Sequence, residues 1–183
     1  MRYIIYALFM LIPYNVGLSS NGLSIGIGQS RDGIDIYRLS FRQEFEKRLH
    51  EDRIFHINNY VEVSSNVWSQ NQEVISGLSI SPVFKFGFNL IESRVIHPYA
   101  ELGIGINYNS RTIIRTRDLS TKLLFEDRIG VGVRVKSFDL NLRYMHYSNA
   151  NIVMPNEGID IIIFSISYLV FTPQMLKSGT DNY

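Results

Sequence analysis

From residue 23 onward the chain alternates apolar and polar side chains with a period of two. Such alternation is typical of β-strands whose two faces meet different surroundings. Leu23, Ile25 and Ile27 share one face, and Ser24, Gly26 and Gly28 share the other. The same alternation recurs in seven further segments, near residues 37–42, 57–63, 78–86, 100–107, 125–134, 139–144 and 159–171. The pattern therefore predicts eight strands and no long amphipathic helix.

An even number of alternating strands of roughly 10 residues is the pattern of a transmembrane barrel. We therefore expect an all-β fold, an eight-stranded antiparallel up-and-down outer-membrane β-barrel whose apolar face meets lipid. The alternative is a soluble barrel with an apolar interior, like a lipocalin. Three features favour the membrane barrel: 11 Tyr and 11 Phe that could form interface girdles, glycines on the polar face, and charges of both signs that could pair in a narrow lumen.

The first 20 residues are typical of a secretory signal sequence. Arg2 supplies the positive charge, residues 4–12 an apolar run, and Gly17 to Ser19 a stretch of small residues around Leu18. The run is too short to span a bilayer as a helix, which needs about 20 residues, and Pro13 interrupts it. We therefore expect a signal peptide at 1–20, a barrel at 21–171 and a C-terminal tail at 172–183.

Composition excludes several functional classes. The chain has no cysteine, so it has neither disulfides nor thiolate metal sites. Its 18 Lys and Arg against 17 Asp and Glu give a net charge of +1, and no basic stripe dominates, so nothing indicates a nucleic-acid partner. One residue conflicts with the barrel pattern, because strict alternation in LFEDRIGVGV turns Asp127 toward lipid, where a charge is costly. A nearby bulge or a position close to the interface would reduce that cost.

The segment HYSNANIVMPNEGID, residues 146–160, joins the last two predicted strands. If the chain starts in the periplasm, residues 149–157 form the fourth external loop. His146 and Ser148 continue the row of Leu140, Leu142 and Tyr144, because side chains at i and i+2 share a face. Both would thus lie on the lipid-facing wall at the level of the outer leaflet.

A hairpin centred on Val153 would place Asp160 directly opposite His146 and Gly158 opposite Ser148. Directly opposed Cβ atoms are about 4.5–5.5 Å apart, so a carboxylate could hold the imidazole. An imidazole can activate a serine hydroxyl, and a carboxylate can orient the imidazole. Asn156, fixed by Pro155, is a candidate oxyanion donor. The alternative is that His146 and Ser148 are polar residues near the headgroups without a catalytic role, and a one-residue slip would destroy the arrangement.

In this segment the chain resembles the lipid A 3-O-deacylase (PagL) family of Gram-negative outer membranes. The His-x-Ser-Asn-Ala and Pro-Asn-x-Gly elements are both present, and the likeness extends through LFEDRIGVGVRV and HPYAELGIGI, so that residues 78–170 match well. The resemblance implies a cofactor-free serine esterase that removes the 3-hydroxyacyl chain at position 3 of lipid A. It implies Ser148 as nucleophile, His146 as base, Asp160 as acid and Asn156 as oxyanion residue. Asn149, which follows the serine as in the family, is a second oxyanion candidate.

The sequence departs from the family at the acid, which is commonly glutamate there and is Asp160 here. The resemblance implies lipid A in the outer leaflet as the partner and no metal, and it leaves open whether the barrel forms a homodimer. Arg111, Arg115 and Arg117 in the preceding external loop could meet lipid phosphates or form an ordinary solvated surface. Two other functions stay open: a non-catalytic small barrel that binds surface partners through its loops, and an outer-membrane phospholipase.

Overall fold

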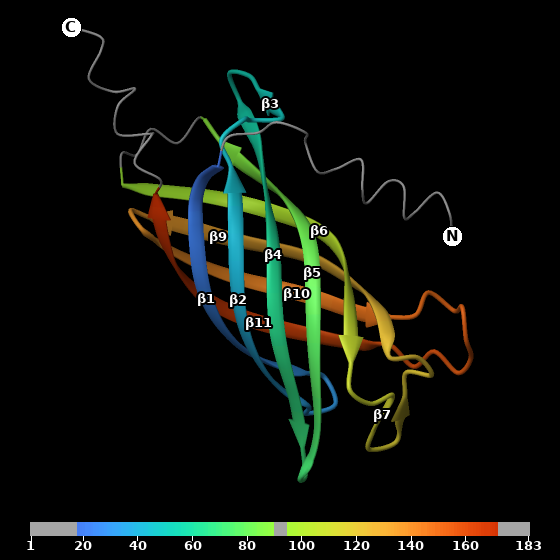
Figure 1. Cartoon of the computed structure of the whole chain (residues 1–183). Coiled ribbons are helices and arrows are strands. Elements are labelled where there is room, and N and C mark those ends of the chain that lie inside the picture. Colours follow the sequence, from blue (N-terminus) through green and yellow to red (C-terminus); the bar gives the residue numbers. More distant parts are fainter. Residues whose placement is uncertain (1–17, 90–94, 172–183) are drawn as a thin grey trace, which may run out of the picture.

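The computed structural model describes residues 18–89 and 95–171 (Figure 1). Eight long strands close into one antiparallel barrel, with β1 paired to β11 and β2 paired to β4. The strands are β1 (Leu18–Ser30), β2 (Asp35–Phe45), β4 (Phe55–Gln70), β5 (Glu73–Phe88), β6 (Ile96–Asn109), β9 (Leu123–Val135), β10 (Phe138–Ser148) and β11 (Ile159–Phe171). The predicted eight-stranded antiparallel barrel is confirmed.

Three short strands lie at opposite ends of the barrel. β3 (His50–Glu51) pairs with β4 at one end, and β7 (Ile113–Ile114) and β8 (Arg117–Asp118) form a hairpin at the other (Figure 1). The end with β7 and β8 is called the external end below, following the expected start of the chain in the periplasm. The described residues include no helix long and apolar enough to cross a membrane.

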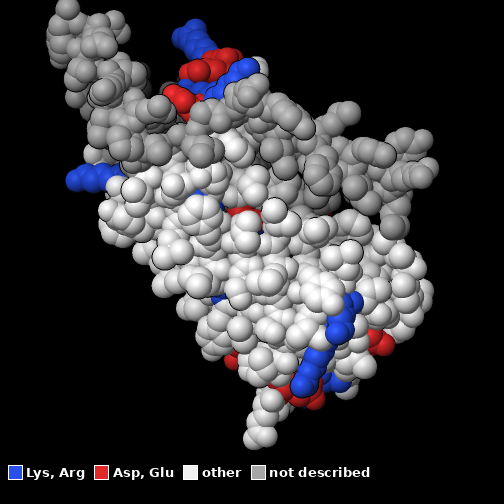
Figure 2. Space-filling model, viewed as in Figure 1, with Lys and Arg blue, Asp and Glu red and all other residues white. Residues whose placement is uncertain are grey.

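The outer wall of the barrel is apolar. Leu23, Ile25 and Ile27 are 60–62% exposed, whereas Ser24 and Gly26 between them are buried. Exposed aromatic residues on this wall include Tyr37, Phe41, Tyr108, Phe138 and Tyr168. On the face shown in Figure 2, charged side chains gather toward the two ends and leave a largely uncharged band between them. This distribution fits a wall that contacts lipid.

The lumen is filled by paired charges. Glu62 accepts contacts from three guanidinium groups, at 3.0 Å from Arg38, 2.9 Å from Arg128 and 3.3 Å from Arg143. Glu126 also binds Arg38, at 2.9 Å, and these side chains are almost completely buried. Buried charges are tolerated when they are paired in this way. Because the charged face is inside, the soluble alternative with an apolar interior is wrong.

Glycines leave room for these long side chains. A Cβ at Gly103 would lie 2.9 Å from Arg128 Cγ, and one at Gly130 would lie 2.9 Å from the Leu142 carbonyl oxygen. The narrow interior therefore has no space for side chains at these positions, as the sequence pattern indicated.

The lumen is not polar along its whole length. A buried apolar cluster closes its external end, a feature that the sequence analysis did not predict. Its members come from the external ends of the strands and from the hairpin of β7 and β8: Ile34, Ile36, Trp68, Ile75, Ile114, Leu119, Leu124, Met145, Tyr147, Ile159, Ile161 and Ile163. Ile114 and Leu119 anchor the hairpin on this cluster, so the loop between β6 and β9 is held against the barrel mouth.

The structure also bears on the expected boundaries. β1 begins at Leu18, so the boundary expected after residue 20 falls inside the first strand, and most of the expected signal lies outside the described residues. β11 ends at Phe171, where the barrel was expected to end. The expected tail, residues 172–183, lies outside the described part of the chain.

Candidate active site

His146 and Asp160 stand directly opposite each other on β10 and β11. The predicted hairpin register is therefore confirmed. His146 Nδ1 lies 2.7 Å from Asp160 Oδ1, and the two side chains are 41% and 52% exposed on the outer wall. An ionised carboxylate can only accept hydrogen bonds, so Nδ1 carries the proton and donates it. That tautomer leaves Nε2 as an acceptor.

Ser148 follows two residues later in the same outward row and is only 8% exposed. Gly158 lies beside both residues, because a Cβ there would be 3.1 Å from His146 Cε1 and 3.4 Å from Ser148 Cβ. On its other side Ser148 pairs with Phe125 of β9. Within the described residues no hydrogen bond joins His146 to Ser148; such bonds are often long in unliganded sites and tighten with substrate.

Two asparagines of the loop between β10 and β11, Asn149 and Asn156, are bonded to each other. The Asn149 backbone N–H donates to Asn156 Oδ1 at 3.0 Å, and Asn156 Nδ2 donates to Asn151 Oδ1 at 3.1 Å. Asn149 Nδ2 donates to the Leu119 and Val153 carbonyl oxygens, at 3.0 and 2.8 Å. All N–H groups of Asn149 are thus engaged, whereas Asn156 keeps one amide hydrogen without a partner in the described part of the chain. The geometry favours Asn156 over Asn149 as an oxyanion donor.

The hairpin of β7 and β8 braces this loop. Arg117 donates to the carbonyl oxygens of Glu157 and Gly158 and pairs with Asp32 of the turn between β1 and β2. Leu119 accepts from Asn149, and the Ser120 hydroxyl donates to the Pro155 carbonyl oxygen. Sequence reasoning missed these contacts, because they join loops far apart in the chain.

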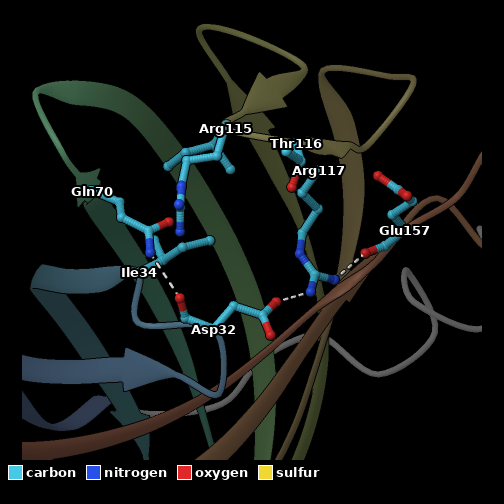
Figure 3. Close-up of a pocket in the computed structure, with 8 residues that line it drawn as sticks. Asp32, Ile34, Gln70, Arg115, Thr116, Arg117 and Glu157 are labelled. Atoms are coloured by element: carbon cyan, nitrogen blue, oxygen red, sulfur yellow. Dashed lines mark hydrogen bonds and ion pairs between the residues drawn. The ribbon is translucent and has the colours of Figure 1, made fainter.

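Figure 3 shows Arg117 extended between Asp32 and Glu157 at the edge of a cavity of about 160 Å³. A second hydrogen bond to Glu157 comes from Asp118, whose backbone N–H donates to the Glu157 carboxylate at 2.5 Å. Of the three arginines considered for lipid phosphates, Arg117 is occupied by these contacts, and Arg111 and Arg115 are exposed.

An apolar groove lies on the outer wall, on the side of His146 away from the external end of the barrel. Tyr144 is the next outward residue of β10, about 7 Å along the strand, and it pairs with Ile162 on one side and Ile129 on the other. The groove has a volume of about 330 Å³, and its lining includes these three residues with Val131 and Leu142. His146 and Asp160 thus lie at the external end of this apolar groove.

Asp127 also lies at the site. It pairs with His146 across β9 and β10 and with Ile104 across β6 and β9, without a bulge at either position. It is the fifth residue from the external end of β9, so its place near the interface, and not a bulge, accounts for its tolerance on the lipid-facing wall. The described residues contain no group of three or more His, Asp and Glu placed to hold a metal ion.

Comparisons with known proteins identify the family. The family model of the lipid A 3-O-deacylases (PagL) matches residues 35–169. The chain is 30% identical over 141 residues to the lipid A deacylase PagL of Pseudomonas aeruginosa, covering 75% of this chain and 80% of that protein. It is 38% identical over 71 residues to the lipid A deacylase PagL of Bordetella bronchiseptica, which covers 38% of this chain and 40% of that protein.

The fold comparison agrees. The crystal structure of the outer-membrane enzyme PagL superposes with a TM-score of 0.75 at 28% identity, covering 80% of this chain and 98% of that chain. Neisserial surface protein A, at 10% identity and a TM-score of 0.52, shares the barrel fold alone. The family match includes β10, β11 and the loop that carries His146, Ser148 and Asp160. The chain is therefore an outer-membrane β-barrel that belongs to the lipid A 3-O-deacylase (PagL) family.

Proposed function

We propose that this barrel hydrolyses the ester bond of the 3-hydroxyacyl chain at position 3 of lipid A, with Ser148 as nucleophile, His146 as general base and Asp160 as the orienting acid. The observation that supports this most directly is the 2.7 Å contact between His146 Nδ1 and Asp160 Oδ1 on the outer wall beside Ser148. A site on this wall could act on a lipid that stays in its leaflet.

The groove gives the substrate a place. An acyl chain could lie along Tyr144, Leu142 and Ile162, which line the groove below His146, while the sugar and phosphates stay at headgroup level. Burial of each methylene is worth about 0.8 kcal/mol, although part of that gain is already available in the bilayer. The groove would therefore orient the ester toward the site more than it would add affinity.

The proposed reaction proceeds in two steps. The Ser148 hydroxyl oxygen attacks the ester carbonyl carbon while His146 Nε2 takes its proton, and Asn156 donates to the oxyanion. The bond between the carbonyl carbon and the sugar oxygen then breaks, and His146 returns the proton to the departing sugar hydroxyl. Water, activated by the same ring, attacks the acyl-serine, releases the 3-hydroxy fatty acid and restores Ser148.

Ser148→Ala tests the nucleophile. We expect the variant to form a folded barrel, because the Ser148 hydroxyl makes no hydrogen bond to another described residue, and to release no hydroxy fatty acid from lipid A. The readout is mass spectrometry of lipid A from cells carrying wild-type protein or the variant. Persisting deacylation would reject Ser148, and unchanged lipid A with both proteins would favour a non-catalytic barrel. Purified protein offered phospholipid in parallel distinguishes a phospholipase.

A further inference from the structure

Asp127 flanks His146 on the side away from Asp160. The register pairs His146 with Asp160 on β11 and with Asp127 on β9, and directly opposed residues have Cβ atoms about 4.5–5.5 Å apart. A carboxylate, an imidazole and a second carboxylate therefore stand in one row across three strands of the outer wall. The sequence pattern had marked Asp127 only as an anomaly.

A place near the interface makes Asp127 tolerable on this wall, but the fold gives its carboxylate no stabilising contact. Its carboxylate makes no hydrogen bond or ion pair to another described residue, and its strand is regularly paired on both sides. The neighbouring outward residues of β9 are Phe125 and Ile129, and its partner on β6 is Ile104. A carboxylate on such a wall costs free energy. The titratable side chain directly across from it is the imidazole of His146.

The charges around His146 come from several elements. Asp160 on β11 and Asp127 on β9 both interact with the ring electrostatically. Arg117, from the hairpin of β7 and β8, and the Tyr144 hydroxyl, on β10 itself, both act on the Asp160 carboxylate. Asp160 therefore shares its negative charge with two further groups, whereas Asp127 shares its charge with no other donor in the described chain.

On the basis of the proposed function, we infer that Asp127 is a positioning residue of the same reaction. When His146 takes the proton of Ser148, the ring becomes a cation between two carboxylates. Asp160 fixes the tautomer through Nδ1, and Asp127 stabilises the positive charge from the opposite side without touching the reacting atoms. An opposite charge within about 4–6 Å favours the charged form of an ionisable group, so Asp127 lowers the barrier to proton transfer from Ser148 to the ring.

The test is the pH dependence of kcat for Asp127→Asn. Purified full-length protein in detergent with lipid A as substrate gives initial rates of hydroxy fatty acid release from mildly acidic to mildly basic pH. We expect the acid limb of the profile to move to lower pH by about 0.5–1 unit, because the imidazolium loses one stabilising carboxylate, and the plateau kcat to fall by about three- to tenfold with little change in KM. The midpoint of the limb does not depend on how much of the variant folds, since unfolded protein lowers only the amplitude.

Asp35→Asn is the matched control. Asp35 is exposed at the external end of β2, which β1 separates from β11, so the same substitution there should leave both the limb and kcat unchanged. An unmoved limb in Asp127→Asn overturns the inference, and so does a rise in KM alone, which would make Asp127 a substrate contact. Ser148→Ala measured beside it separates the two claims: an inactive Ser148→Ala with an unmoved Asp127→Asn limb refutes Asp127 alone, whereas an active Ser148→Ala refutes the proposed nucleophile.

Discussion

Asp160→Asn isolates the charge of the proposed acid. The substitution keeps the size and shape of the side chain and removes the negative charge that lies 2.7 Å from His146 Nδ1. Hydrogen bonds to charged groups contribute about 1.5–3 kcal/mol, and the low end applies because both side chains are about half exposed, 41% and 52%. A loss of about 1.5 kcal/mol in the transition state corresponds to about a tenfold fall in kcat.

The expected loss of kcat is larger if the side-chain amide of the introduced asparagine rotates. With its carbonyl oxygen toward Nδ1 the imidazole keeps the tautomer that serves Ser148, and the loss stays near tenfold. With its amide nitrogen there, Nδ1 becomes the acceptor and Nε2 carries the proton, so the ring cannot act as a base. The equivalent change in a serine protease triad costs about 10⁴ in kcat. We therefore expect kcat to fall by at least about tenfold and by at most about 10⁴.

The assay compares Asp160→Asn with Asp160→Glu under identical conditions. Release of hydroxy fatty acid from lipid A in mixed micelles gives kcat and KM, and circular dichroism verifies that each barrel is folded. Glutamate keeps the charge and adds one methylene, so it should retain more activity than asparagine. If Asp160→Asn is as active as wild-type protein, the carboxylate does not assist His146. If Asp160→Glu is the less active of the two, side-chain length and not charge determines the rate.

Four further results are expected. Glu62→Gln removes the carboxylate that pairs with three buried guanidinium groups and should lower the free energy of unfolding in lipid vesicles by about 3–5 kcal/mol. Glu46→Gln, in the exposed turn after β2, should change that free energy by less than about 0.5 kcal/mol; equal effects would contradict the role given to the lumen network. Gly158→Ala should reduce kcat about three- to tenfold on a folded barrel, because its Cβ would lie 3.1 Å from His146 Cε1 and displace the ring by a fraction of an ångström; full activity would mean that the ring moves freely. The rate of the wild-type enzyme should fall as pH falls, since protonated His146 cannot accept a proton, and a flat profile would argue against a base. EDTA should leave the rate in detergent unchanged, because the proposed steps use only protein groups, so its loss on chelation would reject the metal-free mechanism.

The barrel and the central contact of the site could be predicted from the sequence because both follow from a period of two. Alternation assigns each residue to a face without any knowledge of its partners. The symmetry of one short hairpin then paired His146 with Asp160. The position of Asp127 beside His146 could have been found in the same way. The two residues between β9 and β10, Lys136 and Ser137, form a tight turn that fixes the register of that hairpin as well.

The bracing of the loop could not be predicted, because its contacts join segments that no local pattern links. Arg117 reaches Asp32 across 85 positions of the chain and also bonds to the backbone at Gly158. From the sequence alone, an arginine in an external loop could equally be a solvated residue or a phosphate ligand. The apolar cluster at the mouth was missed for a related reason: Met145, Tyr147 and Ile161 point inward as strict alternation requires, but their apolar character departs from the polar lumen expected along the rest of the strands.

The lumen and the site are linked through β10, because alternate side chains of this strand point into the barrel and out to its wall. Arg143 and Asn141 point into the barrel, where Arg143 bonds to Glu101 at 2.7 Å, while His146 and Ser148, an odd number of residues further on, belong to the outward row. A slip of β10 by one residue would turn Arg143 toward lipid and leave Glu101 and Glu62 facing an apolar partner in the lumen. Breaking such buried pairs costs about 3–5 kcal/mol, far more than a single exposed hydrogen bond could offset. The charged interior, which takes no part in the proposed chemistry, therefore determines that the imidazole meets Asp160 and Asp127 on the outer wall.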